Sequence, residues 1–345
     1  MALAIFLFAC KKNGLTIQPN SNSYNISNGT NLLAGTASVV TTYFAREIAY
    51  TKAVAGGNIS GQNIKESGVC WSTNTNPTIA NFHVVNSSGA LSFSCSMTGL
   101  TANTTYYVRA YIIAKNVATY GNEIAFTTLT TPVYGIDTDM DGNTFRTIKI
   151  GAQTWMLDNL QTVHYLDGTS ILNVTDNAAW SALTTGAYCN YNNDVANVAT
   201  FGRLYNFSAA TDAVHILAPN ASWHIPNQAE WDQLEHYLGG TISDVGVDTV
   251  IGRKLKEAGT VHWAAPNPAD NLSGFTALPA GYRRWDGCFI VKDSCVIFWS
   301  SSLSSVSGYP YGRFMNWKSD WVSWAVLTES GDGGKRGASI RCIKN

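Results

Sequence analysis

Alternating apolar and polar residues mark short strands through the first third of the chain. Leu91, Phe93, Cys95 and Met97 alternate with serines, the pattern of a strand with one buried face. The run Thr105–Ala114 alternates too, and its two faces are predicted to be Tyr106, Val108, Ala110 and Ile112 toward a core and Tyr107, Arg109 and Tyr111 toward solvent. Because such runs recur about every ten residues without a helical period, residues 32–129 are predicted to form an all-β sandwich.

After the short linker at residues 130–132 the pattern changes. Asn227 can cap a helix that runs to Leu238, and Glu230 follows three residues later as in a capping box. Shorter helices are predicted over residues 176–183 and 250–258. Strands are predicted over residues 288–291, 295–300, 312–316, 322–328 and 338–343. Residues 134–345 are therefore predicted to be an α+β domain, with helices early and an antiparallel sheet late.

The chain opens with an apolar run that stops at Cys10. Leu7-Phe8-Ala9-Cys10 resembles a bacterial lipobox, although no basic segment precedes it; an ordinary buried N-terminal strand is the alternative. We interpret residues 1–10 as a lipoprotein signal, with Cys10 as the lipidated residue, and the polar residues 11–31 as a tether. The resemblance implies a lipid-anchored protein of the outer membrane, on the cell surface.

Composition narrows the class of partner. The formal net charge is -1 and only 13% of the residues are charged, so we expect no general attraction to nucleic acid or to anionic lipid. No apolar run reaches the roughly 20 residues that span a bilayer, so a lipid anchor would be the only membrane attachment. The 11 Trp and 16 Tyr suit a strand-rich extracytoplasmic protein.

The cysteines number seven, or six if Cys10 is lipidated. An oxidising compartment permits disulfides, but the spacing does not specify pairs. Cys288 and Cys295 flank a turn-like segment, which would place their strands side by side. Cys70 and Cys95 are predicted to be free and buried.

Three segments of residues 32–129 match one family. They are Leu100-x-x-x-Thr104-x-Tyr106-x-Val108, which corresponds to the segment with the tyrosine corner, Tyr120–Thr128 as a last strand and Gly68–Ser72 as a middle strand. This part of the chain thus resembles a fibronectin type III module, although Ala102 stands where many relatives have Pro. The resemblance implies a spacer or binding platform.

Ordered matches to a second family run through the rest of the chain. They are Gly151–Leu160, Tyr188–Asp194, Gly202–Asn206, Trp223–Trp231, Lys254–Gly259, Gly274–Arg283, Trp299–Ser302 and Ser339–Ile343. Residues 134–345 resemble the Fibrobacter succinogenes major paralogous domain of surface and secreted proteins in Bacteroidetes and Fibrobacteres. Arg203 departs from it, standing where the family has an apolar residue. The resemblance implies a C-type lectin-like fold, and names a domain rather than an activity.

Acidic residues lead into a strong turn signal, Asp141-Gly142-Asn143, which predicts a hairpin. Asp137, Asp139 and Asp141 have the spacing that opens a calcium loop. An EF-hand needs a Glu at loop position 12, where this chain has Ile148. We favour a turn whose acidic residues face solvent over a partial oxygen cage, and predict no cofactor.

Two hypotheses of enzyme activity remain as alternatives. His224 and Glu230 could serve a hydrolase with a site built from loops, although a capping box and a packing turn also account for them. Cys288 and Cys295 are the one thiol pair that copper-dependent oxidation, as in formylglycine-generating enzymes, could use. No nucleophile elbow or phosphate loop is present, so we predict a protein without enzyme activity.

Aromatic residues near the C-terminus give the best binding signal. The series is Tyr282, Trp285, Tyr309, Tyr311, Trp317, Trp321 and Trp324, of which about half are expected in the core. We single out Tyr309, Tyr311, Trp317 and Trp321 as candidate ligand-binding residues. Aromatic faces stack on sugar rings and anchor protein interfaces.

The sequence therefore predicts a non-enzymatic cell-surface lipoprotein, a binding or adhesion module for a polysaccharide or a surface protein. The alternatives are the hydrolase-like enzyme and a structural subunit of an outer-membrane assembly.

Overall fold

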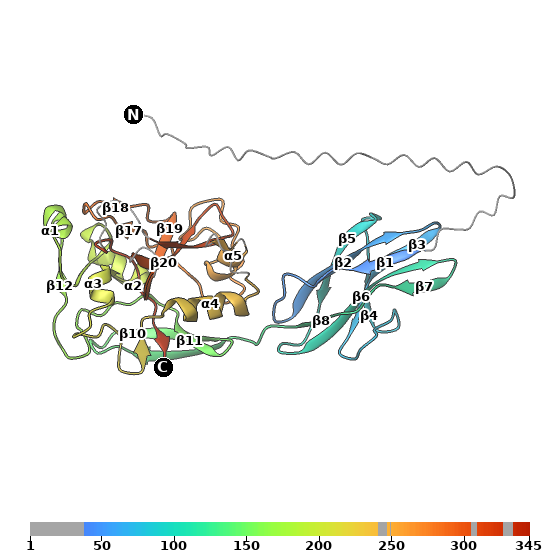
Figure 1. Ribbon diagram of the computed structural model, residues 1–345, viewed down its shortest axis with the longest axis horizontal. Coiled ribbons are helices and arrows are strands. Elements are labelled where there is room, and N and C mark those ends of the chain that lie inside the picture. The colour runs from blue at the N-terminus through green and yellow to red at the C-terminus, as the bar shows by residue number, and fades with distance from the viewer. Residues whose placement is uncertain (1–37, 241–246, 249, 305–308, 327–333) are drawn as a thin grey trace, which may run out of the picture.

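The computed structural model describes residues 38–240, 247–248, 250–304, 309–326 and 334–345. Within these ranges the chain is mostly β-sheet with a few short helices (Figure 1). Of the helices described, none combines the length and the apolar character needed to cross a membrane. Cys10, predicted to carry lipid, and the predicted tether over residues 11–31 lie outside the described residues.

Two sheets pack face to face over residues 39–127. The first has the order β1-β2-β5, and the second has the order β4-β3-β6-β7 with β8 also paired to β6. The strands are β1 (Val39–Thr42), β2 (Lys52–Ser60), β3 (Ile64–Ser72), β4 (Phe82–Val85), β5 (Ser92–Thr98), β6 (Thr105–Ala114), β7 (Val117–Tyr120) and β8 (Ile124–Thr127). Their inner side chains form one apolar core, so this part is a β-sandwich.

The predicted strand faces are correct with two exceptions. The inward residues of β6 are all buried, namely Tyr106, Val108, Ala110 and Ile112. Tyr111 is also fully buried, against expectation, because it pairs across from Gly68 and its hydroxyl donates to Glu66 at 2.8 Å. Leu91 was expected inside but is 59% exposed, because it precedes the first residue of β5.

Tyr106 closes the loop before β6. Its hydroxyl accepts a hydrogen bond from the backbone N–H of Thr101 at 2.9 Å, and its ring stacks on Phe126 with 5.9 Å between centroids. This is the bond of a tyrosine corner, in which a strand-start tyrosine reaches back to the backbone upstream.

Four sheets occur in the described part of residues 133–345, in the orders β15-β22-β11-β10-β9, β12-β13-β14, β16-β21-β20-β19 and β17-β18. Their strands are β9 (Val133–Thr138), β10 (Thr144–Ile150), β11 (Gln153–Met156), β12 (Leu172–Asn173), β13 (Ala187–Cys189), β14 (Leu204–Tyr205), β15 (Trp223–His224), β16 (Val247–Asp248), β17 (Tyr282–Arg283), β18 (Phe289–Ile290), β19 (Cys295–Leu303), β20 (Pro310–Asn316), β21 (Val322–Val326) and β22 (Ile343–Lys344). The hairpin predicted around Asp141-Gly142 is confirmed as β9–β10.

Helices in this part are short. The predicted helix after Asn227 is confirmed as α4 (Gln228–Tyr237), and the capping box with Glu230 is present. The remaining α-helices are α1 (Asn177–Ser181), α2 (Val198–Phe201), α3 (Phe207–Ala210) and α5 (Ile251–Leu255). Helix α5 ends before the predicted residue 258 because Lys256 turns extended and bridges Ala277. The described part of residues 133–345 is therefore richer in β-strand, and poorer in helix, than an α+β domain was predicted to be.

Two predictions about the late strands were wrong. Cys288 and Cys295 do not flank neighbouring strands, because β18 pairs with β17 whereas β19 pairs with β20. The predicted strand over residues 338–343 is divided, since Ala338 bridges Tyr205, Ser339 bridges Phe298, and only Ile343 lies in β22. Because residues 338, 339 and 343 pair with three different segments, residues 338–343 do not form one continuous strand.

The sandwich and the second part meet at a packed junction. Leu129 packs against the apolar core that includes Trp231 and Phe275. The N–H of Thr130 donates to the hydroxyl of Tyr237 at 3.2 Å, and Tyr50 donates its hydroxyl proton to the carbonyl of Leu272.

Candidate functional site

Two of the four aromatic candidates share one turn. Trp317 and Trp321 flank the β20–β21 connection, and each is partly exposed. Trp317 packs one side against the core, with the ammonium of Lys318 4.5 Å from its ring centroid. Trp321 lies 5.9 Å from the ring of Phe314. We call residues 316–321 the aromatic turn.

The aromatic turn is held by hydrogen bonds within the turn and by hydrogen bonds from a buried lysine. The Oδ1 of Asn316 accepts from the N–H groups of Lys318 and Ser319, at 2.9 and 3.1 Å. The Nζ of Lys256, a fully buried side chain, donates to the carbonyls of Asn316 and Ser319 at 2.8 Å each. Burial lowers the pKa of Lys256 to about 8, against the opposing attraction of Asp320. Lysine is seldom fully buried, so Lys256 was not predicted from the sequence as part of a site.

Tyr309 and Tyr311 lie at the other end of the same sheet. Tyr309 precedes β20 and is 37% exposed, and Tyr311, partly exposed, is opposite Val326 of β21. The seven residues of β20 span about 20 Å, which separates them from Trp317. The four candidates therefore form two separate pairs rather than one surface.

The acidic hairpin residues act as hydrogen-bond acceptors. Asp139 is 6% exposed rather than in solvent, and accepts from the N–H groups of Asp141 and Asn143 at 3.0 and 2.8 Å. Asp137 accepts from the indole of Trp223 at 2.9 Å. The carboxylates face different donors, and no metal-binding group of three His, Cys, Asp or Glu occurs among the described residues.

Asp141 reaches away from the hairpin to a neighbouring segment. Its carboxylate contacts Thr162 Oγ1 and His164 Nδ1 at 2.5 Å each and the N–H of Val163 at 2.6 Å. Burial acts to raise the pKa of Asp141, and these hydrogen bonds outweigh it and lower the pKa. Asp141 thus joins two segments.

His224 and Glu230, the hydrolase candidates, are in contact. His224 Nε2 lies 2.8 Å from Glu230 Oε1, and its Nδ1 lies 2.6 Å from the Oδ1 of Asn345. The second carboxylate oxygen of Glu230 accepts from the N–H of Asn227 at 2.8 Å. Both ring nitrogens and both carboxylate oxygens therefore have partners within the fold.

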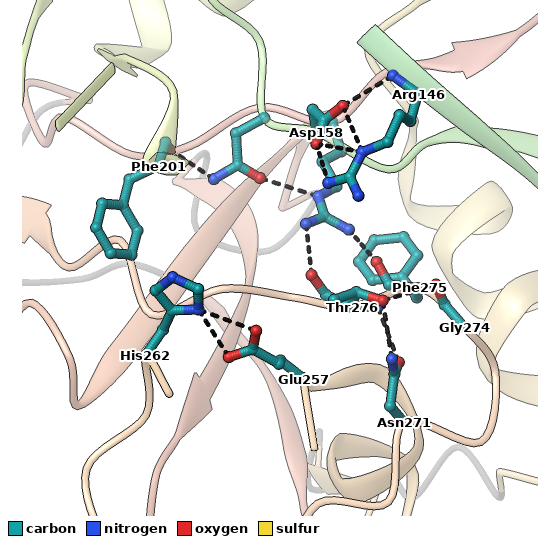
Figure 2. Close-up of polar contacts among 11 residues, drawn as sticks. Arg146, Asp158, Phe201, Glu257, His262, Asn271, Gly274, Phe275 and Thr276 are labelled. Atoms are coloured by element: carbon teal, nitrogen blue, oxygen red, sulfur yellow. Dashed lines mark hydrogen bonds and ion pairs between the residues drawn. The ribbon is translucent and has the colours of Figure 1, made fainter. Parts of the chain in front are cut away.

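Arg341 organises the centre of the domain, and Figure 2 labels two residues whose carbonyls accept its hydrogen bonds, Phe275 and Thr276. Its guanidinium is fully buried and donates to the Oδ1 of Asn159 at 2.9 Å, to the carbonyl of Thr276 at 2.9 Å and to the carbonyl of Phe275. The ring of Phe275 lies 4.5 Å from the guanidinium carbon. Burial lowers the pKa of Arg341. The residue joins three chain segments and is not open to a ligand.

Two more arginines play the same part elsewhere. Arg283 donates to the carbonyls of Gly287 and Val174 at 2.8 and 2.6 Å. Arg313 donates to Glu235 and to Asp232 on α4, at 2.5 and 2.7 Å. All three arginines are fully buried, so they stabilise the fold and are not accessible to a ligand.

The described cysteines are all free thiols. Cys70 and Cys95 are buried, as predicted, and burial raises the pKa of Cys70 to about 11. Cys288 is exposed whereas Cys295 is buried, and burial raises the pKa of Cys295 to about 12. Because a reactive cysteine needs an accessible thiolate, Cys295 is a poor partner for copper-dependent chemistry.

A shallow apolar groove beside β9 was not predicted from the sequence. The groove has a volume of about 610 Å³ and is lined by Tyr134, Gly135, Ile136, Arg146 and Leu157. Apolar residues at successive positions of one strand, Val133, Tyr134 and Ile136, were the available signal.

Comparison with solved structures gives similarity over a small part of the chain. It covers 27% of this chain and 95% of a short form of the sensor domain of the anti-sigma factor RsgI4 from Pseudobacteroides cellulosolvens, with 19% identity and a TM-score of 0.22. A fibronectin type III domain of the human KIAA0970 protein is matched over 27% of this chain and 74% of its own length, with 12% identity and a TM-score of 0.20. No curated protein matches.

Residues 148–344 match the family model of the Fibrobacter succinogenes major domain. The match runs from β10 to β22 and covers more than half of the chain. It includes the segments that carry Lys256, Arg283 and Arg341, whose buried side chains hold the domain together. The chain therefore belongs to the Fibrobacter succinogenes major domain family.

Proposed function

We propose that this chain is a non-enzymatic binding protein of the bacterial cell surface, and that the aromatic turn contacts its ligand. The observation that carries this proposal is a hydrogen-bonded turn with two partly exposed Trp side chains, whose carbonyls accept from the buried Lys256. A preordered turn loses little conformational entropy when a ligand binds.

The ligand is a polysaccharide or a surface protein. Trp317 and Trp321 offer aromatic surface, and Lys318 adds a cation beside it. Sugar rings stack on such faces, and Trp is enriched among the residues that dominate protein interfaces.

The absence of enzyme activity is part of the proposal. It is supported by the contacts that His224 and Glu230 make within the fold. His224 contacts Glu230 and Asn345, and Glu230 also accepts from Asn227 in the capping box of α4. A general base must reach a substrate proton, and here each ring nitrogen of His224 and each carboxylate oxygen of Glu230 already contacts a partner within the fold.

We further propose the arrangement of the whole chain. Residues 32–129 form a fibronectin type III-like spacer, supported by the corner bond of Tyr106, and residues 134–345 form a C-type lectin-like domain. Lipid on Cys10 and the tether over residues 11–31 hold both at the outer membrane.

A glycan array probed with the full chain, and then with Trp317→Ala and Trp321→Ala, tests the binding proposal. Interface hot spots cost about 2 kcal/mol or more, roughly a thirtyfold loss of affinity. Tyr309→Ala is the matched control, because Tyr309 lies at the far end of β20 and should leave binding unchanged.

Thermal melts of the same variants separate binding from folding. A buried Trp costs about 3–5 kcal/mol of stability when replaced by Ala, so partly exposed Trp317 and Trp321 should lose less. Severe unfolding of both variants, or full binding by both, would place the ligand surface elsewhere. Turnover of a bound glycan would favour the hydrolase instead.

A further inference from the structure

We propose that the free edge of β9 binds an extended segment of a partner protein as an added β-strand. Strand β9 (Val133–Thr138) is the last in the sheet order β15-β22-β11-β10-β9 and pairs with β10 alone. Across the described ranges, no other strand covers its outer side. This edge is separate from the aromatic turn, so the two proposals can fail independently.

The register shows which backbone groups point outward. The carbonyl of Arg146 accepts from the N–H of Leu157 at 2.8 Å, on the β11 side of β10. Backbone groups alternate along a strand, so Phe145 and Thr147 face β9, where they lie opposite Asp137 and Gly135. The N–H and C=O of the intervening residues of β9 therefore point away from the sheet.

The open part of the edge is thus Tyr134 and Ile136. Thr138 has the same orientation, and its carbonyl accepts from the Nδ2 of Asn220 at 3.0 Å, which closes that end. These two residues offer an added strand two outward N–H donors and two outward C=O acceptors, the main-chain groups on which strand addition depends.

The side chains at this edge are apolar and exposed. Val133 and Tyr134 are 61% exposed and Ile136 is 77% exposed. Proteins usually protect an edge strand with charges, proline or a bulge, because unpaired backbone groups recruit other strands. Between Val133 and Ile136 no such device occurs.

The groove beside β9 gives the added strand a place for its side chains. Tyr134, Ile136 and Leu157 line it, with the Arg146 guanidinium at its margin in an ion pair with Asp158. An incoming strand would present alternate side chains to this groove. The best ligand is therefore extended and apolar at every second position.

The occupant is a peptide segment rather than a second copy of this chain. Stable interfaces bury about 800 Å² on each partner. The six residues of β9 extend about 20 Å and offer far less area than that to an identical strand. Strand addition to an extended peptide instead draws its affinity from main-chain hydrogen bonds.

The test uses the full chain and random ten-residue peptides displayed on phage. Selected peptides are synthesised and methylated on one backbone nitrogen at a time. We expect at least a tenfold loss of affinity at every second position, because only alternate N–H groups face β9. Equal affinity at all positions would overturn strand addition.

A matched pair of variants locates the site. Ile136→Pro removes an outward N–H without removing a bond to β10, and should weaken peptide binding at least tenfold. Ile136→Val retains the N–H and should bind almost normally. Trp317→Ala should bind peptide normally, because the aromatic turn is a different surface.

Three further results would overturn the proposal. Peptides that bind Ile136→Pro and the parent chain equally would place the peptide site elsewhere. Failure to select any peptide from a diverse library would show that an extended peptide is not the ligand of this edge. Sedimentation that shows a dimer, lost in Ile136→Pro, would make a second copy the occupant.

Discussion

Buried cations tie this domain together at the scale of single residues. Arg341, Arg283 and Lys256 donate mainly to backbone carbonyls of loops rather than to carboxylates. Such loops cannot satisfy their own carbonyl groups, and a buried carbonyl without a donor is costly. A long cationic side chain reaches several of them at once.

Arg341→Lys should destabilise the protein by about 3 kcal/mol or more. A lysine cannot reach the Asn159 side chain and both loop carbonyls in the fork geometry of a guanidinium, and hydrogen bonds to charged groups contribute about 1.5–3 kcal/mol each. Urea unfolding measures the loss. Arg146→Lys, at a side chain that is 62% exposed and pairs with Asp158, should cost less than about 1 kcal/mol. Equal losses would contradict a special role for Arg341.

Lys256 should make stability depend on pH. Its pKa is about 8 in the fold and about 10.4 in an unfolded chain. Between these values the unfolded chain binds more protons, so the Lys256 contribution to the free energy of unfolding rises with pH and is lost as pH falls through 8. Neutral amine still has two N–H donors for its two carbonyls.

The measurement is the difference in unfolding free energy between the parent chain and Lys256→Met at pH 7, 8, 9 and 10. This difference should grow in favour of the parent as pH rises. Lys149→Met, at an exposed position, should give a flat difference. A difference that falls with pH would reverse the sign of the argument.

Local hydrogen bonds define individual elements. Helix α4 begins where the Oδ1 of Asn227 accepts from the N–H of Glu230 at 3.0 Å and the carboxylate of Glu230 accepts from the N–H of Asn227. The β9–β10 connection is shaped by Asp139 in the same way. Both are side chains that replace missing backbone partners.

Asn227→Ala should cost about 1 kcal/mol of stability, because it removes the cap acceptor of α4. Chemical denaturation detects a change of this size. Asn227→Ser keeps an acceptor at the cap and should retain most of the stability. If the two variants are equally unstable, the cap bond is not the cause.

Calcium should leave the melting temperature unchanged. The carboxylates of Asp137, Asp139 and Asp141 accept hydrogen bonds from separate donors, and a cation would have to displace those donors. A ligand present at 100 times its dissociation constant adds about 2.7 kcal/mol, which a melt resolves easily. A calcium-dependent rise that disappears in Asp139→Ala would establish a metal site.

At the scale of the whole molecule, two β-rich parts meet at a defined junction. Leu129 and Tyr50 of the first part contact the second through its core and through the carbonyl of Leu272. These contacts lie on both sides of the linker at residues 130–132, so the two parts touch at more than one point.

Cys10→Ser should release the protein from the membrane. Lipidation contributes about 0.8 kcal/mol for each buried methylene, so several acyl chains anchor firmly. Fractionation of cells should move the variant to the soluble fraction, and mass spectrometry should find lipid on the parent alone. Unchanged membrane partitioning, with no lipid on the parent, would exclude the anchor.

The sequence pattern was sufficient to predict an element wherever residues a few positions apart determine that element. The alternation at β6, the cap at Asn227 and the turn at Asp141-Gly142 each predicted the element that the structure contains. Periodicity and capping depend on neighbours a few residues apart, which the sequence displays directly. The family motifs likewise located the second domain.

Burial and side-chain neighbours required the folded chain. Tyr111 is buried because Gly68 lies opposite, and Lys256 is buried because the aromatic turn places carbonyls above it. The separation of Tyr309 from Trp317 follows from the length of one strand, and the free edge of β9 from the order of the sheet. Each depends on residues far apart in the sequence, whose contacts arise only when sheets pair and pack, so a local pattern carries no record of them.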